Sequence, residues 1–173
     1  MLEVDPFRIA TDIMTATLRS NSGDSNFSID VISSSEYAHD QGFDASIKLH
    51  GLHWDGDHQH PFSTSIDGIW LHGANLAALR QHIVEWLARP IERLTVEDLD
   101  AEFELACLPE QRLDVRLGSR QDTISHLNPV VSIEFSAGTI EGQFHFVTDQ
   151  SCLAIFAQEL SFMMQAPVGG LDG

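Results

Sequence analysis

Basic residues are scarce in this sequence, and their scarcity argues against one class of partner. The 173 residues include 9 Lys and Arg against 26 Asp and Glu, which gives a formal net charge of −17 at pH 7. Proteins that bind nucleic acids gain most of their affinity from basic side chains on phosphates. We therefore expect no nucleic-acid partner. A basic protein partner fits the charge better, although such a charge also simply keeps a protein soluble.

Cysteines and long apolar runs are scarce as well. The two cysteines, Cys107 and Cys152, fall in segments predicted to be buried, which favours free thiols in a reducing compartment over a disulfide. The first residues, MLEVDPFRIATDIM, carry acidic residues where a secretory signal has positive charge. No apolar run approaches the roughly 18 residues that a membrane span requires. We expect a cytoplasmic protein without a membrane partner.

Several catalytic motifs are missing too. The sequence contains no Gly-rich phosphate loop, GxGxxG, CxxC or GxSxG. Nucleotide, redox and α/β-hydrolase functions therefore lack their defining residues, and no side chain stands out as a nucleophile. The length fits one domain over residues 1–173, with a frayed tail at 166–173. The absent motifs favour a non-enzymatic protein.

Half-buried strands dominate what is present. In GFDASIKLHG, apolar and polar side chains alternate, and HPFSTSIDGIWL continues this pattern after the pair Asp55-Gly56. That pair favours a two-residue hairpin turn, which would place Leu49 opposite Phe62. Residues 1–40 are less regular: FRIATDIMTATLRS could be strand or helix, NSGDSN reads as a turn, and FSIDVI reads as a strand.

Two later segments have the three-to-four spacing of amphipathic helices. The first is ANLAALRQHIVEWLARP, and the second is TDQSCLAIFAQELSFMM, with Thr148 or Asp149 as its N-cap. Between them, AEFELAC, RLDVRLG, VVSIEF and IEGQFHFV alternate as strands. The predicted fold class is α+β: a largely antiparallel meander sheet with two amphipathic helices packed on one face, in two strand-then-helix halves. SIKL in the first half echoes SIEF in the second. The predicted apolar helix positions are Leu76, Leu79, Ile83 and Leu87, then Leu153, Phe156, Ala157, Leu160 and Met163.

The polar face of the predicted strands leans acidic. The run TVEDLDAEFE is the densest acidic stretch of the chain. Such a surface attracts a basic partner at long range and speeds association, although one solvated face is also normal for an antiparallel sheet. The candidate partner-binding residues are Glu97, Asp98, Asp100, Glu102, Glu104 and Glu134.

The segment LHGLHWDGDHQH, residues 49–60, is a candidate metal site. In the predicted hairpin, His53 lies opposite His58, His60 shares their face, and His50 points to the other side. Such a group could hold Zn²⁺ or a similar ion, although nothing in the sequence supplies a second shell. HWDGDH also approaches the HxHxDH pattern of metallo-β-lactamase-like hydrolases, with an aspartate where the second histidine belongs. The candidate ligands are His53, Asp55, Asp57, His58 and His60.

Three functions therefore stay open at this point. The first is a protein-binding module, and the second is a metal-binding protein or metal-dependent hydrolase that uses the histidine-rich hairpin. The third is a small-ligand-binding or assembly module that uses the groove between helices and sheet. The oligomeric state is not indicated by any of these patterns.

Three segments together resemble a known family. They are NLAALRQHIVEWL, LTVEDLDAEFELACLPEQRLDVRLG and IEFSAGTIEGQFHFVTDQSCLAIFAQEL. Over roughly residues 43–164, this pattern resembles the WapI-like immunity proteins of bacterial polymorphic toxin systems. The resemblance implies a small, acidic, cytoplasmic protein that is not an enzyme and that binds and blocks a toxin domain, commonly a nuclease. Toxin contacts vary within that family, so no binding residue is carried over.

Overall fold

The computed structural model describes residues 14–33, 42–119 and 128–165, and the order of four strands followed by a helix occurs twice in them. The first half contains β1 (Met14–Arg19), β2 (Asn26–Ser33), β3 (Gly42–Asp55), β4 (His58–His72) and α1 (Gly73–Leu87). Two short 3-10 helices, η2 (Ile91–Arg93) and η3 (Glu97–Leu99), lead to the second half. That half contains β5 (Ala101–Glu104), β6 (Gln111–Gly118), β7 (Val130–Ala137), β8 (Ile140–Val147) and α2 (Gln150–Gln165).

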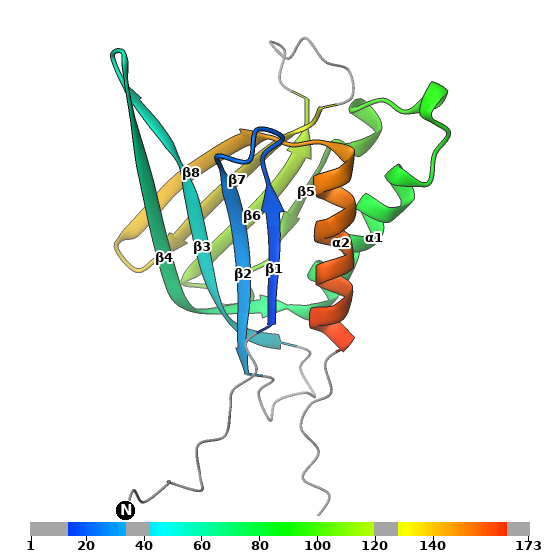
Figure 1. The fold of residues 1–173 in the computed structure, drawn as a ribbon. Coiled ribbons are helices and arrows are strands. Elements are labelled where there is room, and N and C mark those ends of the chain that lie inside the picture. The colour runs from blue at the N-terminus through cyan, green and yellow to red at the C-terminus, as the bar shows by residue number, and fades with distance from the viewer. Residues whose placement is uncertain (1–13, 34–41, 120–127, 166–173) are drawn as a thin grey trace, which may run out of the picture.

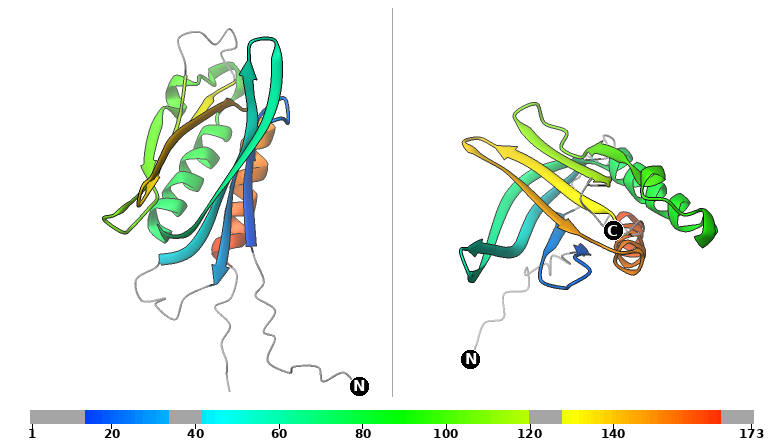
Figure 2. Two further views of the ribbon diagram at one scale, coloured as in Figure 1. Left: turned by 90° about the vertical axis from the view of Figure 1, so that its left-hand side faces the viewer. Right: turned by 90° about the horizontal axis from the view of Figure 1, so that it is seen from above.

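Each half forms its own antiparallel sheet. Sheet A has the order β1-β2-β3-β4, and sheet B has the order β5-β6-β7-β8. The strands of sheet B cross behind those of sheet A, and the two helices lie along one side of the pair (Figures 1 and 2). The predicted α+β class, the antiparallel strands and the two strand-then-helix halves are confirmed. The meander is divided between two sheets because α1 separates β4 from β5, so these strands are not joined by a hairpin.

The apolar stripes of both helices are buried in the core. In α1 the buried residues are Leu76, Leu79, Ile83 and Trp86. All five predicted positions of α2 are buried, and Phe156 lies 6.5 Å from the ring of Phe27 in β2. Asp149 caps α2, as predicted, because its carboxylate accepts a hydrogen bond from the Cys152 backbone N–H at 2.8 Å. Leu87, predicted to be in the stripe, is only partly buried, and Trp86 takes the central position instead.

The similarity between SIKL and SIEF corresponds to equivalent places in the two halves. Ser46–Leu49 lies in β3 and Ser132–Phe135 lies in β7, the third strand of each sheet. Each of these strands leads into a hairpin and then a helix. The weak sequence repeat therefore coincides with a structural one.

The outer edge of β1 is closed by the second helix. The Thr17 backbone N–H donates to the Glu159 carboxylate at 2.7 Å, and the Thr148 hydroxyl donates to the Arg19 carbonyl at 2.7 Å. An exposed strand edge offers unpaired backbone groups to other chains. These contacts remove that opportunity along β1.

The predictions for the ends of the chain are tested only in part. The mixed pattern before NSGDSN is a strand over Met14–Arg19, because Ala16 and Leu18 alternate toward the core. The predicted tail at 166–173 and most of the polar loop GSRQDTISHLNP lie outside the described residues. Both cysteines are free thiols, as expected. In the described part of the chain, no helix is both long and apolar enough to cross a membrane.

Candidate functional site

The turn of the histidine-rich hairpin falls one residue later than predicted. Gly56 and Asp57 form it, so His53 lies opposite His60. The predicted pairing of His53 with His58 is wrong. Only the turn and the pairing change, because the four-histidine segment still forms the end of one long hairpin.

Glycine chemistry explains this shift. Gly56 occupies the first central position of the turn with φ of 59°. Two-residue hairpin turns require positive φ there, which glycine adopts without strain and Asp55 would not. Leu49 consequently pairs with Thr64 instead of the predicted Phe62. Because the partner moves by two residues, the predicted core-facing side chains keep their face.

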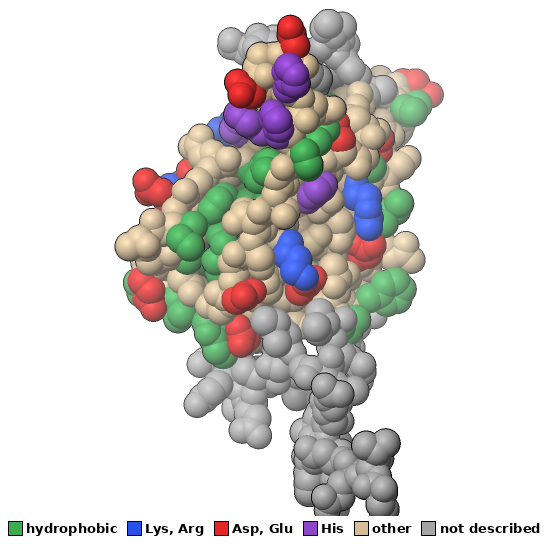
Figure 3. Space-filling view, turned by 60° about the vertical axis from the view of Figure 1, so that its left-hand side comes forward, with side chains coloured by type: hydrophobic (Ala, Val, Ile, Leu, Met, Phe, Trp, Pro, Cys, Tyr) green, Lys and Arg blue, Asp and Glu red, His purple; other side chains and the backbone are tan. Residues whose placement is uncertain are grey.

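The five candidate metal ligands do not form a metal site. All of them are exposed, and the histidines form a group at the tip of the molecule (Figure 3). No three His, Cys, Asp or Glu side chains within 14–33, 42–119 and 128–165 are arranged so that they could hold a metal ion. A zinc site needs at least three protein donors about 2.0–2.2 Å from one point. The candidate set His53, Asp55, Asp57, His58 and His60 is therefore not arranged as a zinc site requires.

The six candidate acidic residues are spread over η3 and the outer face of sheet B. On β5 they alternate with Phe103, which packs against the core, and this alternation turns the two strand glutamates outward. Glu134 is the one member of the set that is partly buried. The set consists of Glu97 and Asp98 in η3, Asp100 after it, Glu102 and Glu104 on β5, and Glu134 on β7.

Strand register brings three carboxylates into one row on this face. Glu104 lies opposite Asp114, and Asp114 lies opposite Glu134. Like charges directly opposite one another are destabilising. Arg112 offsets part of this repulsion, because its guanidinium pairs with Asp114 and lies 2.8 Å from the Glu134 carboxylate. We call Glu104, Asp114 and Glu134 the carboxylate row.

One arginine serves two members of the carboxylate row. The carboxylate of Asp114 raises the pKa of Arg112 above its ordinary value, so this guanidinium stays charged. Glu104 has no ion pair of its own within the described residues. Neither Asp114 nor Arg112 was among the candidate partner-binding residues predicted for this face. Aligning β5, β6 and β7 side by side in the sequence would have shown this row.

Two other candidates already have basic partners. Asp98 lies 2.7 Å from Arg89, and Asp100 lies 3.2 Å from Arg116. A hydrogen bond from the Thr95 hydroxyl, together with Arg89, lowers the pKa of Asp98. These ion pairs are exposed and contribute little to stability. In the parts of the chain that the structure describes, Glu97 and Glu102 have no such partner within 4 Å.

A shallow hollow lies beside the carboxylate row, between β5 and β6. Its volume is about 760 Å³. Glu102, Glu104 and Asp114 contribute carboxylates to its lining, and Arg112 is the only basic residue there. A hollow of this kind can take a cationic side chain from another protein, because the carboxylates supply the opposite charge.

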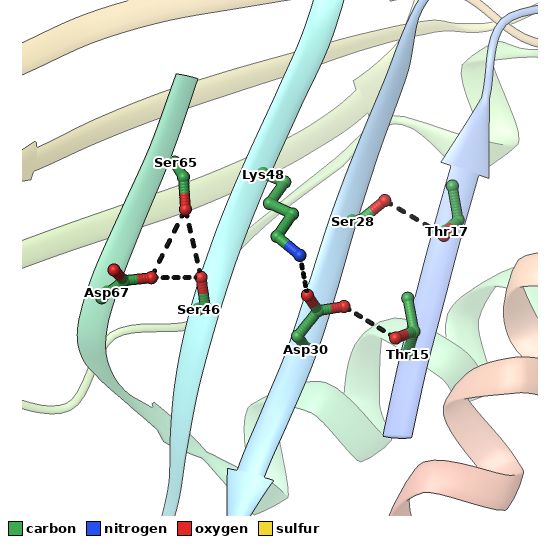
Figure 4. Close-up of polar contacts among 8 residues, drawn as sticks. All are labelled: Thr15, Thr17, Ser28, Asp30, Ser46, Lys48, Ser65 and Asp67. Carbon is green, nitrogen blue, oxygen red and sulfur yellow. Dashed lines mark hydrogen bonds and ion pairs between the residues drawn. The ribbon is translucent and has the colours of Figure 1, made fainter. Parts of the chain in front are cut away.

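The outer face of sheet A carries a different polar network (Figure 4). Asp30 accepts a hydrogen bond from Thr15 at 2.7 Å and an ion pair from Lys48 at 2.6 Å. Ser46 donates to Asp67 at 2.6 Å. The hydrogen bond and charge of Asp30 raise the pKa of Lys48. The polar groups of this network thus bond one another, a pattern that sequence reasoning missed.

Both cysteines lack the environment of a reactive thiol. Burial raises the pKa of Cys107, and burial followed by the charge of Asp149 raises the pKa of Cys152. Because the thiolate is the nucleophile, these thiols are poor candidates for catalysis. Between the helices and the sheets, Trp86 of α1 and Phe156 of α2 are buried in the core.

Comparison of the sequence with protein-family models gave no match, and comparison with curated proteins gave none either. The case for a function therefore depends on the residues themselves.

Proposed function

We propose that this chain is a non-enzymatic protein-binding module of the immunity type, which neutralises a basic toxin or effector domain. The observation that carries the proposal is the carboxylate row. Glu104, Asp114 and Glu134 lie side by side, Arg112 pairs with Asp114 and Glu134, and Glu104 has no ion pair within the described residues. A lysine or arginine of a partner would supply the missing positive charge at that place.

Charge supports the proposal over a longer range. The net charge of −17 attracts a basic domain before contact and raises the rate of association. Glu102 is exposed and lines the hollow, and Glu97 is exposed in η3, which precedes β5. The resemblance to WapI-like immunity proteins implies the same kind of partner and a cytoplasmic location.

Reversing charges on this face tests the proposal. The tagged chain is purified from its own cells, and the co-purifying proteins are identified for the wild type and for the double variant Glu102→Lys/Glu104→Lys. We expect the wild type to retain a basic protein and the variant to lose it. The matched control is Glu85→Lys/Glu92→Lys, which changes the net charge equally at exposed positions of α1 and η2.

Association kinetics of the captured partner complete the test. The β5 variant should associate more slowly, and its rate should depend less on salt, because long-range attraction is lost. Equal rates for the β5 variant and its control would exclude this face. A chain that emerges alone, or with an acidic protein only, would overturn the proposal as a whole.

A further inference from the structure

We propose that the open edge of β8 binds an extended, positively charged segment of a partner protein, which adds a fifth strand to sheet B. This inference rests on the proposed function, since it assumes a basic protein partner. It places the contact at a different edge of the sheet from η3 and β5. Strand addition is a common mode of peptide recognition, in which backbone hydrogen bonds supply affinity and side chains supply selectivity.

Hairpin geometry determines which backbone groups of β8 face outward. The β7–β8 turn has two residues, so Ala137 and Ile140 beside it bond to each other, and every second pair does likewise. Glu141, Gln143 and His145 therefore direct their N–H and C=O groups away from β7. Val147 continues this series, and its carbonyl accepts a hydrogen bond from the Asn21 N–H at 3.0 Å. The outward direction is thereby confirmed at one end of the strand.

The other sheet edges are covered or short. The edge of β1 is closed by Glu159 and Thr148. The last part of β4 bonds to the segment before β6, because the His72 N–H donates to the Leu105 carbonyl at 2.8 Å. In the upper part of β4, Pro61 interrupts the edge, since proline has no N–H. β5 has only four residues and contacts α1.

β8 has an open edge without a proline, whereas the open part of β4 around Ser63 contains Pro61. No backbone hydrogen bond from Glu141, Gln143 or His145 to a partner outside sheet B occurs within the described residues. The side chains of all three residues are exposed. An extended segment of another protein can therefore approach this edge along its length.

Apolar side chains lie next to this edge. Phe144 of β8 packs edge-on against Phe62 of β4, with ring centroids 5.5 Å apart, and Phe62 is 38% exposed. Ile140, at the start of β8, is 54% exposed. Figure 3 shows a diagonal band of hydrophobic side chains below the histidines on this side of the molecule. An added strand can cover such a band with every second side chain.

Charge determines the kind of strand that fits. Neither the hairpin segment Leu49–Ile66 nor β8 contains a lysine or arginine, while Asp55, Asp57 and Glu141 are exposed. Cross-strand pairs of opposite charge stabilise a sheet, and like charges oppose pairing. The structure therefore points to a segment in which apolar residues alternate with lysine or arginine.

A short synthetic peptide in which valine and lysine alternate is the probe. It is titrated into the isotopically labelled full chain at neutral pH and followed by NMR. We expect the amides of Glu141, Gln143 and His145 to shift and to gain protection from hydrogen exchange. A peptide in which glutamate replaces lysine controls for charge, and one with a central proline controls for strand formation.

Proline variants of the protein locate the edge. Gln143→Pro removes an outward N–H without removing a bond of the β7–β8 ladder, and should weaken peptide binding by at least about tenfold. Ser63→Pro makes the equivalent change on β4 and should alter binding less than about twofold. Thermal unfolding verifies that both variants are folded.

Four outcomes would overturn the inference. They are absence of shifts in β8, equal binding of the glutamate peptide, loss of binding only in Ser63→Pro, and a free chain that is already dimeric through β8. Failure here leaves the Glu102→Lys/Glu104→Lys experiment unaffected. If that charge reversal abolishes partner capture and Gln143→Pro does not, the proposed function stands and the strand addition is wrong.

Discussion

The outer faces of the two sheets differ in how their carboxylates are paired. On sheet A, Asp30 is 6% exposed and is bonded to both Thr15 and Lys48. On sheet B, Arg112 pairs with Asp114 and Glu134, and the third carboxylate of the row, Glu104, is exposed and has no ion pair within the described residues. On sheet A the central carboxylate is therefore held by a hydrogen bond and an ion pair, while on sheet B one carboxylate of the row has no basic partner among the described residues. The difference shows that two four-stranded antiparallel sheets of one chain can differ in how far their outward carboxylates are paired, according to the side chains that they carry.

Removing the centre of the sheet A network should have the largest effect. Asp30→Ala leaves Thr15 and Lys48 without their acceptor, so we expect the free energy of unfolding to fall by about 2 kcal/mol. The same truncation on sheet B, Glu104→Ala, should change it by less than about 0.5 kcal/mol. Chemical denaturation of the two variants measures both values. Equal losses would show that the two faces do not differ as described.

The closed and open strand edges offer a second contrast. Glu159→Ala removes the acceptor of the Thr17 N–H, and we expect a loss of about 1 kcal/mol together with faster hydrogen exchange at Thr17. Gln143→Ala, on the open edge of β8, should leave stability within about 0.5 kcal/mol. Unchanged exchange at Thr17 would mean that Glu159 does not close this edge.

The response to alkaline pH should also differ between the faces. Asp30 raises the pKa of Lys48, so the protonated amine is favoured in the folded state. Its contribution to stability is complete below the ordinary pKa of 10.5 and is lost as pH rises through the higher folded value. The variant Lys48→Met should lose less stability than the wild type above about pH 10. Parallel stability curves for the two proteins would contradict this assignment.

The smallest expected effect has the opposite sign. Glu104→Gln relieves repulsion in the carboxylate row, and we expect a gain of about 0.3 kcal/mol that shrinks as salt is added. The matched change on sheet A, Asp67→Asn, should lower stability, since a neutral amide oxygen is a weaker acceptor for the Ser46 hydroxyl than the Asp67 carboxylate. A loss of stability in Glu104→Gln would mean that the row is not under repulsion.

The spacing of apolar residues predicted most of the fold, because buried side chains recur at every second residue in a strand and at every third or fourth residue in a helix. The alternating residues of RLDVRLG, VVSIEF and IEGQFHFV face the core as expected, as do both helical stripes except Leu87. Two glycines account for the main error in the first hairpin. Gly56 takes the turn position, and Gly68, with φ of 71°, lies at a bulge between Ile66 and Ile69. Positive φ at these positions depends on the backbone of the whole hairpin. The alternation of apolar and polar residues carries no information on it.

Of the candidate site, the sequence predicted only which acidic side chains point outward. Alternation indicated that Glu102 and Glu104 point outward, but the role of Arg112 requires the alignment of β6 with both neighbours. The histidine-rich segment shows a related limit of reasoning from sequence spacing. Four closely spaced histidines in the sequence become exposed side chains along an extended hairpin, which do not surround one point.

The bond between Thr17 and Glu159 joins residues 142 positions apart, and this has a consequence for synthesis. At about 5–20 residues per second, translation needs on the order of 10 s to make the chain between them. During that interval α2 has not yet been made, so β1 lacks the helix that covers its edge in the folded protein. Synthesis of α2 is therefore the step that protects this edge from pairing with another nascent copy.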